Sequence, residues 1–168
     1  GSICRENVIG IDLYPTLLEA TESPSPKGYE LDGVSIAPLL RNAEVRLSRK
    51  AIHWHFPAYL QGYTARHGHF RTTPAAATRM GDWKLIEFFE DGALELYNTA
   101  NDISETKNLA EKNLEKTKEL HAAMLAWRKF VNAPVPTELN PEYASGSATV
   151  PSPKKPKLKK KKGNNKKP

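Results

Sequence analysis

The sequence predicts a small α+β domain, in which an antiparallel sheet of three to four strands with a central hairpin is packed by a long C-terminal helix. The hairpin is indicated by two segments of alternating apolar and polar residues, 83–89 and 93–97, on either side of Asp91-Gly92. Glycine supplies the positive φ that such a turn needs. The helix is indicated by residues 111–131, where Leu, Met, Trp and Val recur at three- and four-residue spacing and form one apolar stripe.

One further strand is predicted at residues 51–56, where aromatic and β-branched residues alternate before Pro57. Residues 58–73 then predict a long loop, and residues 98–109 predict a polar loop after the hairpin. This order of strand, loop, hairpin and helix fits an antiparallel sheet with a helix on one face and water on the other.

Two short helices are predicted before the sheet. Asp12 is expected to cap the first, because its side chain can accept hydrogen bonds from the free amides of a first helical turn. A turn at Asp32-Gly33 leads to the second, with Ser35 as its cap and Pro38 early in the helix. We expect these first forty residues to pack on something larger.

The charge of the chain is unevenly distributed. The formal net charge is +6, but residues 151–168 contain nine lysines and no acidic residue, so the other residues together carry −3. We expect this tail to be solvated and disordered, because it combines Lys and Pro with a single large apolar residue, Leu158. Binding of polyanions by the tail is the functional alternative.

Several common features are missing from the sequence. Its single cysteine, Cys4, excludes an intrachain disulfide. No apolar run reaches the length of a transmembrane helix. No signal peptide is visible, which carries no information if the chain is part of a longer protein.

Four segments carry a family resemblance. They are Asp12-Leu13-Tyr14-Pro15-Thr16-Leu17-Leu18, Leu31-Asp32-Gly33-Val34-Ser35 with Pro38-Leu39-Leu40, Gly81-Asp82-Trp83-Lys84-Leu85-Ile86, and Glu95-Leu96-Tyr97-Asn98 with Asn101-Asp102, Glu105 and Asn108-Leu109-Ala110. In this order and spacing they resemble the C-terminal third of the sulfatases, within the alkaline phosphatase superfamily. The segment from His53 to Pro57 further resembles the bacterial arylsulfatase type.

In such enzymes a large α/β domain holds the active site. A Cys or Ser in a Cys/Ser-x-Pro-x-Arg motif becomes formylglycine there, and a calcium ion stabilises charge on the sulfate oxygens. The resemblance implies that residues 1–45 end this large domain and that residues 46–135 form the C-terminal α+β subdomain. Residues 136–168 would then be an extended and disordered Lys-rich tail.

Catalytic residues are not expected in this chain. Cys4 is followed by Arg5-Glu6-Asn7-Val8 rather than x-Pro-x-Arg, and no adjacent aspartates are present to bind a metal. The resemblance thus implies the C-terminal portion of a sulfatase that is inactive alone and has no metal or cofactor of its own. The full-length enzyme would use Ca²⁺ and formylglycine.

The resemblance also implies partners and a location. The partners would be the missing N-terminal catalytic domain and a sulfated substrate such as a polysaccharide. The family is periplasmic or secreted, so we expect the same of the parent protein.

Substrate contacts are predicted in the loop 59–73 and at the end of the strand before it. The candidates are His55, Arg66, His67, His69 and Arg71. The arginines could bind anionic groups through bidentate contacts, and the histidines could bind hydroxyls or sulfate oxygens. The His-x-His spacing at 53–55 and 67–69 also fits a metal site, although no carboxylate or cysteine lies at ligand spacing. A purely structural role is the third interpretation.

Two other functions stay open at this point. The chain could be a stand-alone module that binds anionic polymers through its Lys-rich tail. It could also be a fragment of a related phosphodiesterase or phosphonate hydrolase, because these relatives have similar C-terminal regions. The segment from Asn101 to Ala110 favours a sulfatase.

Overall fold

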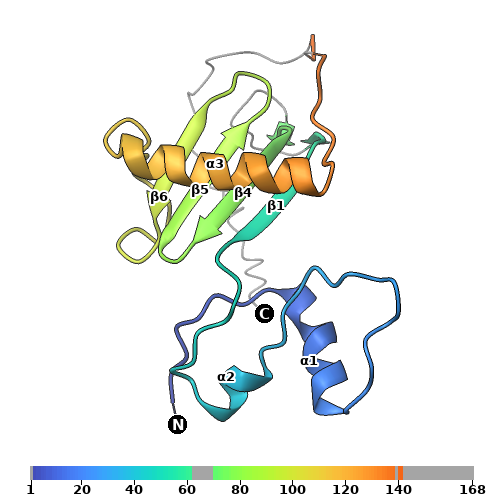
Figure 1. Ribbon diagram of the computed structural model, residues 1–168. Helices are drawn as coiled ribbons and strands as arrows, with labels where there is room; N and C mark the ends of the chain where they lie inside the picture. Colours follow the sequence, from blue (N-terminus) through green and yellow to red (C-terminus); the bar gives the residue numbers. More distant parts are fainter. Residues whose placement is uncertain (1, 62–69, 139, 142–168) are drawn as a thin grey trace, which may run out of the picture.

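The computed structural model describes residues 2–61, 70–138 and 140–141, without the side chains of residues 61, 70 and 71. It contains a sheet with one long helix across it and an N-terminal part with two short helices beside one end of the sheet (Figure 1). The predicted α+β class is confirmed. No helix in the described part is long and apolar enough to cross a membrane.

The main sheet has four antiparallel strands in the order β1-β4-β5-β6. They are β1 (Ile52–Phe56), β4 (Ala75–Met80), β5 (Trp83–Phe88) and β6 (Leu94–Asn98). The predicted hairpin is β5–β6, where the amide of Phe88 donates to the carbonyl of Ala93 at 3.0 Å. Gly92 has a φ of 66°, as the turn requires.

The long helix α3 (Leu114–Phe130) crosses one face of this sheet (Figure 1). Successive side chains of a strand point to opposite faces, so one row of paired residues, from His53 through Thr78 and Leu85 to Leu96, faces the helix. Leu120 and Met124 of α3 pack on this face and are fully buried. The core cluster is Ala76, Leu85, Leu96, Ala110, Leu120 and Met124.

Strand β4 is an element that the sequence pattern does not predict. It begins with Ala75-Ala76-Ala77, and alanine favours helix when considered alone. However, β4 lies between β1 and β5 and is hydrogen-bonded on both sides. Ala76 is 2% exposed at the contact between sheet and helix, so tertiary packing overrides the local preference.

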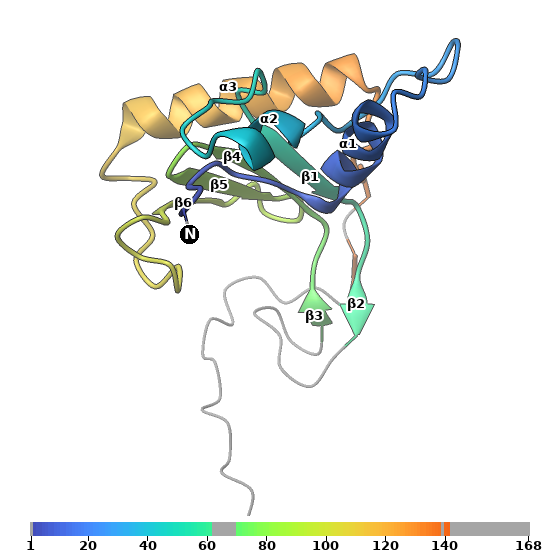
Figure 2. The same ribbon diagram turned by 90° about the horizontal axis from the view of Figure 1, so that it is seen from below.

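A second, two-stranded sheet joins β2 (Leu60–Gln61) to β3 (Phe70–Thr72). The prediction of one continuous loop over residues 58–73 is therefore wrong at both ends. The register of this pair is irregular, and each strand is too short to give a pattern in the sequence. The small sheet extends from the main sheet on the side away from α3 (Figure 2).

The N-terminal part contains a short 3-10 helix η1 (Gly10–Asp12), followed by α1 (Leu13–Ala20) and α2 (Ala37–Arg41). Ser35 accepts a hydrogen bond from the amide of Ala37 at 3.2 Å, but the N-cap residue of α2 is Ile36, so the predicted cap is wrong by one residue. The prediction that Asp12 caps α1 is wrong. Asp12 stands at the N-cap position of α1, but its carboxylate makes no capping bond to this helix and instead accepts hydrogen bonds from Arg49 and from the amide of Ile9 before η1.

Candidate functional site

His55 is the predicted site residue whose side chain the structure describes. Arg66, His67 and His69 lie outside the described residues, and only the backbone of Arg71 is described, within β3. The roles proposed for these four residues stay predictions.

His55 lies on the face of β1 that α3 covers. Its Nε2 is 2.6 Å from the carbonyl oxygen of Pro134, and its ring centroid is 5.5 Å from that of Phe89 and 6.3 Å from that of Trp127. Its Nδ1 is buried and has no hydrogen-bond partner among the described residues. His55 therefore connects the end of β1 to the segment that follows α3.

His53, two residues earlier, stacks on Trp127 with ring centroids 4.8 Å apart, and its Nδ1 lies 2.8 Å from the hydroxyl of Thr78. Burial lowers the pKa of His53, because a charged imidazole is poorly solvated there. Within the described residues, no group of three His, Cys, Asp or Glu side chains could hold a metal ion.

Asp12 joins separate segments of the N-terminal part. It is fully buried, and its two carboxylate oxygens accept hydrogen bonds from Arg49 at 2.6 and 2.9 Å. The backbone amides of Ile9 and Val34 also donate to it, at 2.9 and 3.1 Å. Burial raises the pKa of Asp12, but the hydrogen bonds from Arg49 and the two amides outweigh burial and hold the pKa below its usual value.

Gly33 explains the Asp-Gly pair in the second segment of the resemblance. A Cβ atom at this position would lie 2.2 Å from the carbonyl oxygen of Ile11, which no side chain can do. The chain around residue 33 thus lies directly against the backbone before α1. Glycine is required here for close approach of two backbone segments.

The polar loop after β6 is shaped by Asp102 and Asn108. Asp102 accepts hydrogen bonds from the amides of Lys107 and Thr106 at 2.9 Å each, and these bonds lower its pKa. Asn108 accepts from the amide of Leu96 at 3.0 Å and donates to the carbonyl of Leu94 at 3.1 Å. These residues of the fourth segment therefore shape the loop that packs along β6.

The part of the sheet face opposite α3 that surrounds β1 is apolar and partly uncovered. Trp54 and Phe56 of β1 are 41% and 40% exposed on this face. The strand register places Ala75, Ala77, Ile86 and Phe88 beside them. A second apolar surface lies on α1, where Leu13 and Leu17 are 59% and 60% exposed.

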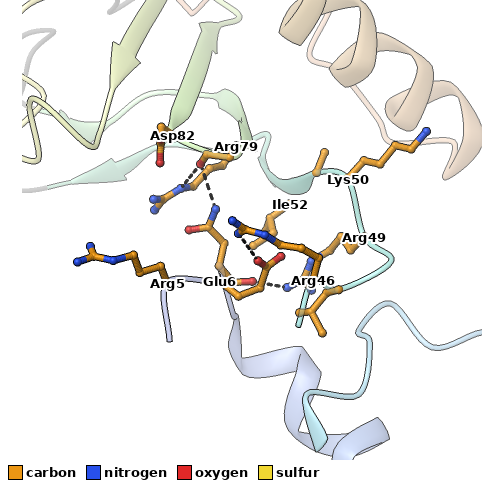
Figure 3. Close-up of a pocket in the computed structure, with 12 residues that line it drawn as sticks. Arg5, Glu6, Arg46, Arg49, Lys50, Ile52, Arg79 and Asp82 are labelled. Atoms are coloured by element: carbon orange, nitrogen blue, oxygen red, sulfur yellow. Dashed lines mark hydrogen bonds and ion pairs between the residues drawn. The ribbon is translucent and has the colours of Figure 1, made fainter. Parts of the chain in front are cut away.

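A pocket of about 260 Å³ lies where the N-terminal segment meets the ends of β1 and β4 (Figure 3). Its charged lining residues are Arg5, Glu6, Arg46, Arg49, Lys50, Arg79 and Asp82. Arg46 forms an ion pair with Glu6 at 2.8 Å, and Arg49 is bound to Asp12. Sequence reasoning missed this pocket, because its residues come from three segments that only the fold brings together.

Comparison with known proteins places the chain in a family. The family described as "N-sulphoglucosamine sulphohydrolase, C-terminal" matches residues 1–129. A sulfatase from Formosa agariphila is 36% identical over 168 residues, an alignment that covers 92% of this chain and 28% of that protein. The uncharacterized sulfatase YdeN from Escherichia coli strain K12 is 24% identical, in an alignment that covers 80% of this chain and 28% of that protein.

A solved structure supports the same placement. BT4656, in complex with its substrate D-glucosamine-2-N,6-O-disulfate, is 27% identical with a TM-score of 0.58, and the match covers 76% of this chain and 25% of that one. The chain therefore spans little more than a quarter of the length of the relatives that it matches. It belongs to the sulfatase family, of which it represents the C-terminal region.

Proposed function

We propose that this chain is the C-terminal part of an enzyme that hydrolyses sulfate esters, and that it acts by packing on the catalytic α/β domain. The match to the C-terminal region of sulfatases, over 28% of a relative's length, is the observation that carries this proposal. The sequence contains no Cys/Ser-x-Pro-x-Arg motif, so the nucleophile belongs to another part of the protein. The chain alone is then inactive.

The calcium ion of such enzymes is held by carboxylate and amide oxygens. We place the calcium ion and the formylglycine in the catalytic domain and assign no catalytic step to this chain. The parent protein is proposed to be periplasmic or secreted, where extracellular sulfated polymers are accessible.

The uncovered apolar surfaces support a role in domain packing. Contiguous exposed apolar surface on a soluble domain usually marks a contact with another domain or protein. The aromatic pair Trp54 and Phe56 and the α1 leucines offer two such surfaces. Burying apolar area stabilises an interface by about 25 cal/mol per Å². We propose that the α/β catalytic domain covers the sheet face opposite α3.

The activity is tested by reading the coding sequence upstream of Gly1 and by assaying the resulting full-length protein with 4-methylumbelliferyl sulfate. We expect a Cys/Ser-x-Pro-x-Arg motif upstream, hydrolysis by the full-length protein, and none by residues 1–168 alone. Hydrolysis by the chain alone would contradict the proposal. Cleavage of a phosphonate monoester in place of the sulfate ester would instead favour the alternative that the chain is part of a phosphonate hydrolase.

The packing role is tested by Trp54→Asp in the full-length protein. The substitution places a charge in the proposed interface, so we expect sulfatase activity to fall by at least about tenfold, as for a central interface residue. Ile103→Asp is the matched control, because Ile103 is 80% exposed in the loop after β6. Equal activity of the two variants would show that the sheet face is not the interface.

A further inference from the structure

The pocket in Figure 3 has more positive charge than its own carboxylates neutralise. Arg46 and Arg49 are each bound to an acid. Arg5, Lys50 and Arg79 form no ion pair with any described residue. Lys50 points away from the pocket, whereas the guanidinium groups of Arg5 and Arg79 lie on the same side of it (Figure 3).

Arg79 is difficult to explain as a structural residue. It lies directly opposite Lys84 in the β4–β5 pairing, and like charges at facing positions destabilise a sheet. Lys84 is neutralised by Glu105, with both carboxylate oxygens at 2.8 Å. Arg79 has no such partner in the described part, where its Nε donates only to the carbonyl of Gly81 at 3.2 Å.

The backbone around the two arginines is fixed. Asn7, two residues after Arg5, donates to the carbonyl of Gly81 at 3.0 Å. The same carbonyl accepts from Arg79 at 3.2 Å, so one turn holds both Arg79 and the segment that carries Arg5. Arg49 also donates to the carbonyl of Asn7 at 2.8 Å, which holds this segment against the start of β1. The pocket is therefore formed by anchored segments.

We propose that Arg5 and Arg79 bind an acidic group, a sulfate or a carboxylate, of a saccharide substrate in this pocket. The inference rests on the proposed function and names a feature of its substrate, a second acidic group besides the ester that is cleaved. Planar guanidinium groups bind sulfate and carboxylate oxygens in a bidentate manner. Asp82 also lines the pocket, and its carboxylate would accept hydrogen bonds from sugar hydroxyls.

The size of the pocket favours a sugar over a free ion. At about 30 Å³ for each water molecule, 260 Å³ corresponds to roughly nine waters, enough for a sugar ring with its substituent. A second pocket of about 170 Å³ adjoins it, because both are lined by Arg5, Glu6 and Arg46. The two pockets together could accept an extended saccharide.

The test uses the full-length protein and two ligands, D-glucosamine-2-N,6-O-disulfate and the matching 6-O-monosulfate. The nucleophile of the Cys/Ser-x-Pro-x-Arg motif is replaced by Ala in every variant, so that the ligands are bound but not hydrolysed. Calorimetry on Arg79→Gln should then show roughly tenfold weaker binding of the disulfate and a change of less than about twofold for the monosulfate, because the monosulfate lacks the second acidic group. Arg5→Gln should act in the same direction. Arg41→Gln removes one positive charge from an exposed ion pair on α2 and is the matched control.

Each outcome decides the inference. Selective loss of disulfate binding in the two pocket variants, with a melting temperature close to that of the wild type, supports it. Equal losses for Arg41→Gln would assign the effect to net charge and overturn the inference. A lower melting temperature of Arg79→Gln with unchanged disulfate affinity would assign Arg79 to packing and also overturn it. Aryl sulfate turnover by the wild type tests the proposed function independently of these results.

Discussion

At the scale of single residues, the buried Asp12–Arg49 pair makes the sharpest prediction. Asp12→Asn keeps the shape of the side chain but leaves the Arg49 charge, 12% exposed, without its counter-charge. Breaking a buried pair from one side typically costs about 3–5 kcal/mol. We expect the free energy of unfolding, measured in urea, to fall by roughly this amount. Glu19→Gln, which removes the exposed ion pair with Arg41, should cost less than about 1 kcal/mol.

The stability that the Asp12–Arg49 pair contributes is expected to decrease at acidic pH. The pKa of Asp12 is lower in the folded protein than its usual value, so the folded state binds its proton less readily than the unfolded state. The stabilisation is complete above the usual aspartate pKa and is lost as the pH falls through the lowered folded pKa. Asp12→Asn should therefore lose less stability than the wild type between pH 5 and pH 2. Parallel acid titrations of the two proteins would contradict this assignment.

Gly33 gives a second prediction at the residue scale. Gly33→Ala forces a Cβ to within 2.2 Å of a backbone oxygen, and backbone cannot move away as a flexible side chain can. We expect a loss of about 1–3 kcal/mol or more in the free energy of unfolding, as for overpacking elsewhere. Gly10→Ala is the control, since a Cβ there meets nothing within 4 Å. A Gly33→Ala protein as stable as Gly10→Ala would show that the two segments do not touch.

At the scale of elements, the contact between α3 and the sheet carries the core. Met124 is fully buried against the sheet, whereas Leu125 on the same helix is 45% exposed. Met124→Ala should lower the free energy of unfolding by about 2–5 kcal/mol through lost contacts and a cavity. Leu125→Ala has nearly the same effect on helix propensity, and we expect it to cost less than about 1 kcal/mol. Similar costs for both variants would mean that the helix packs on the sheet through a different face.

The elements that the sequence predicts are those with a local pattern. The β5–β6 hairpin has Gly92 in its turn, and α3 has an apolar stripe that packs on the sheet. Strand β4 has no such pattern, because Ala76 is buried only when α3 packs on the sheet. The role of Asp12 could not be predicted from its local sequence either. Its carboxylate binds Arg49, which lies 37 positions later in the chain.

The candidate site shows the limit of sequence reasoning more clearly. His55 is predicted as a substrate contact from its place at the end of a strand. The structure places it against Trp127 and the carbonyl of Pro134, contacts that no sequence pattern reveals. The pocket at Arg79 depends on strand register and on the N-terminal segment crossing to the β4–β5 turn. The family resemblance reached the correct protein class because it used four segments in order, each of which has a structural reason in the fold.

At the scale of the whole molecule, the uneven distribution of charge predicts which part of the protein binds polyanions. Residues 151–168, which lie outside the described residues, carry nine lysines, and without them the net charge changes from +6 to −3. Removing them should abolish retention on a heparin column at low salt, because binding by many lysines depends on release of counterions. Small sulfated sugars should bind the shortened protein as before, since the pocket at Arg79 is intact. Retention that survives the deletion would place polymer binding on the folded part, with Arg5 and Arg79 as the first residues to substitute.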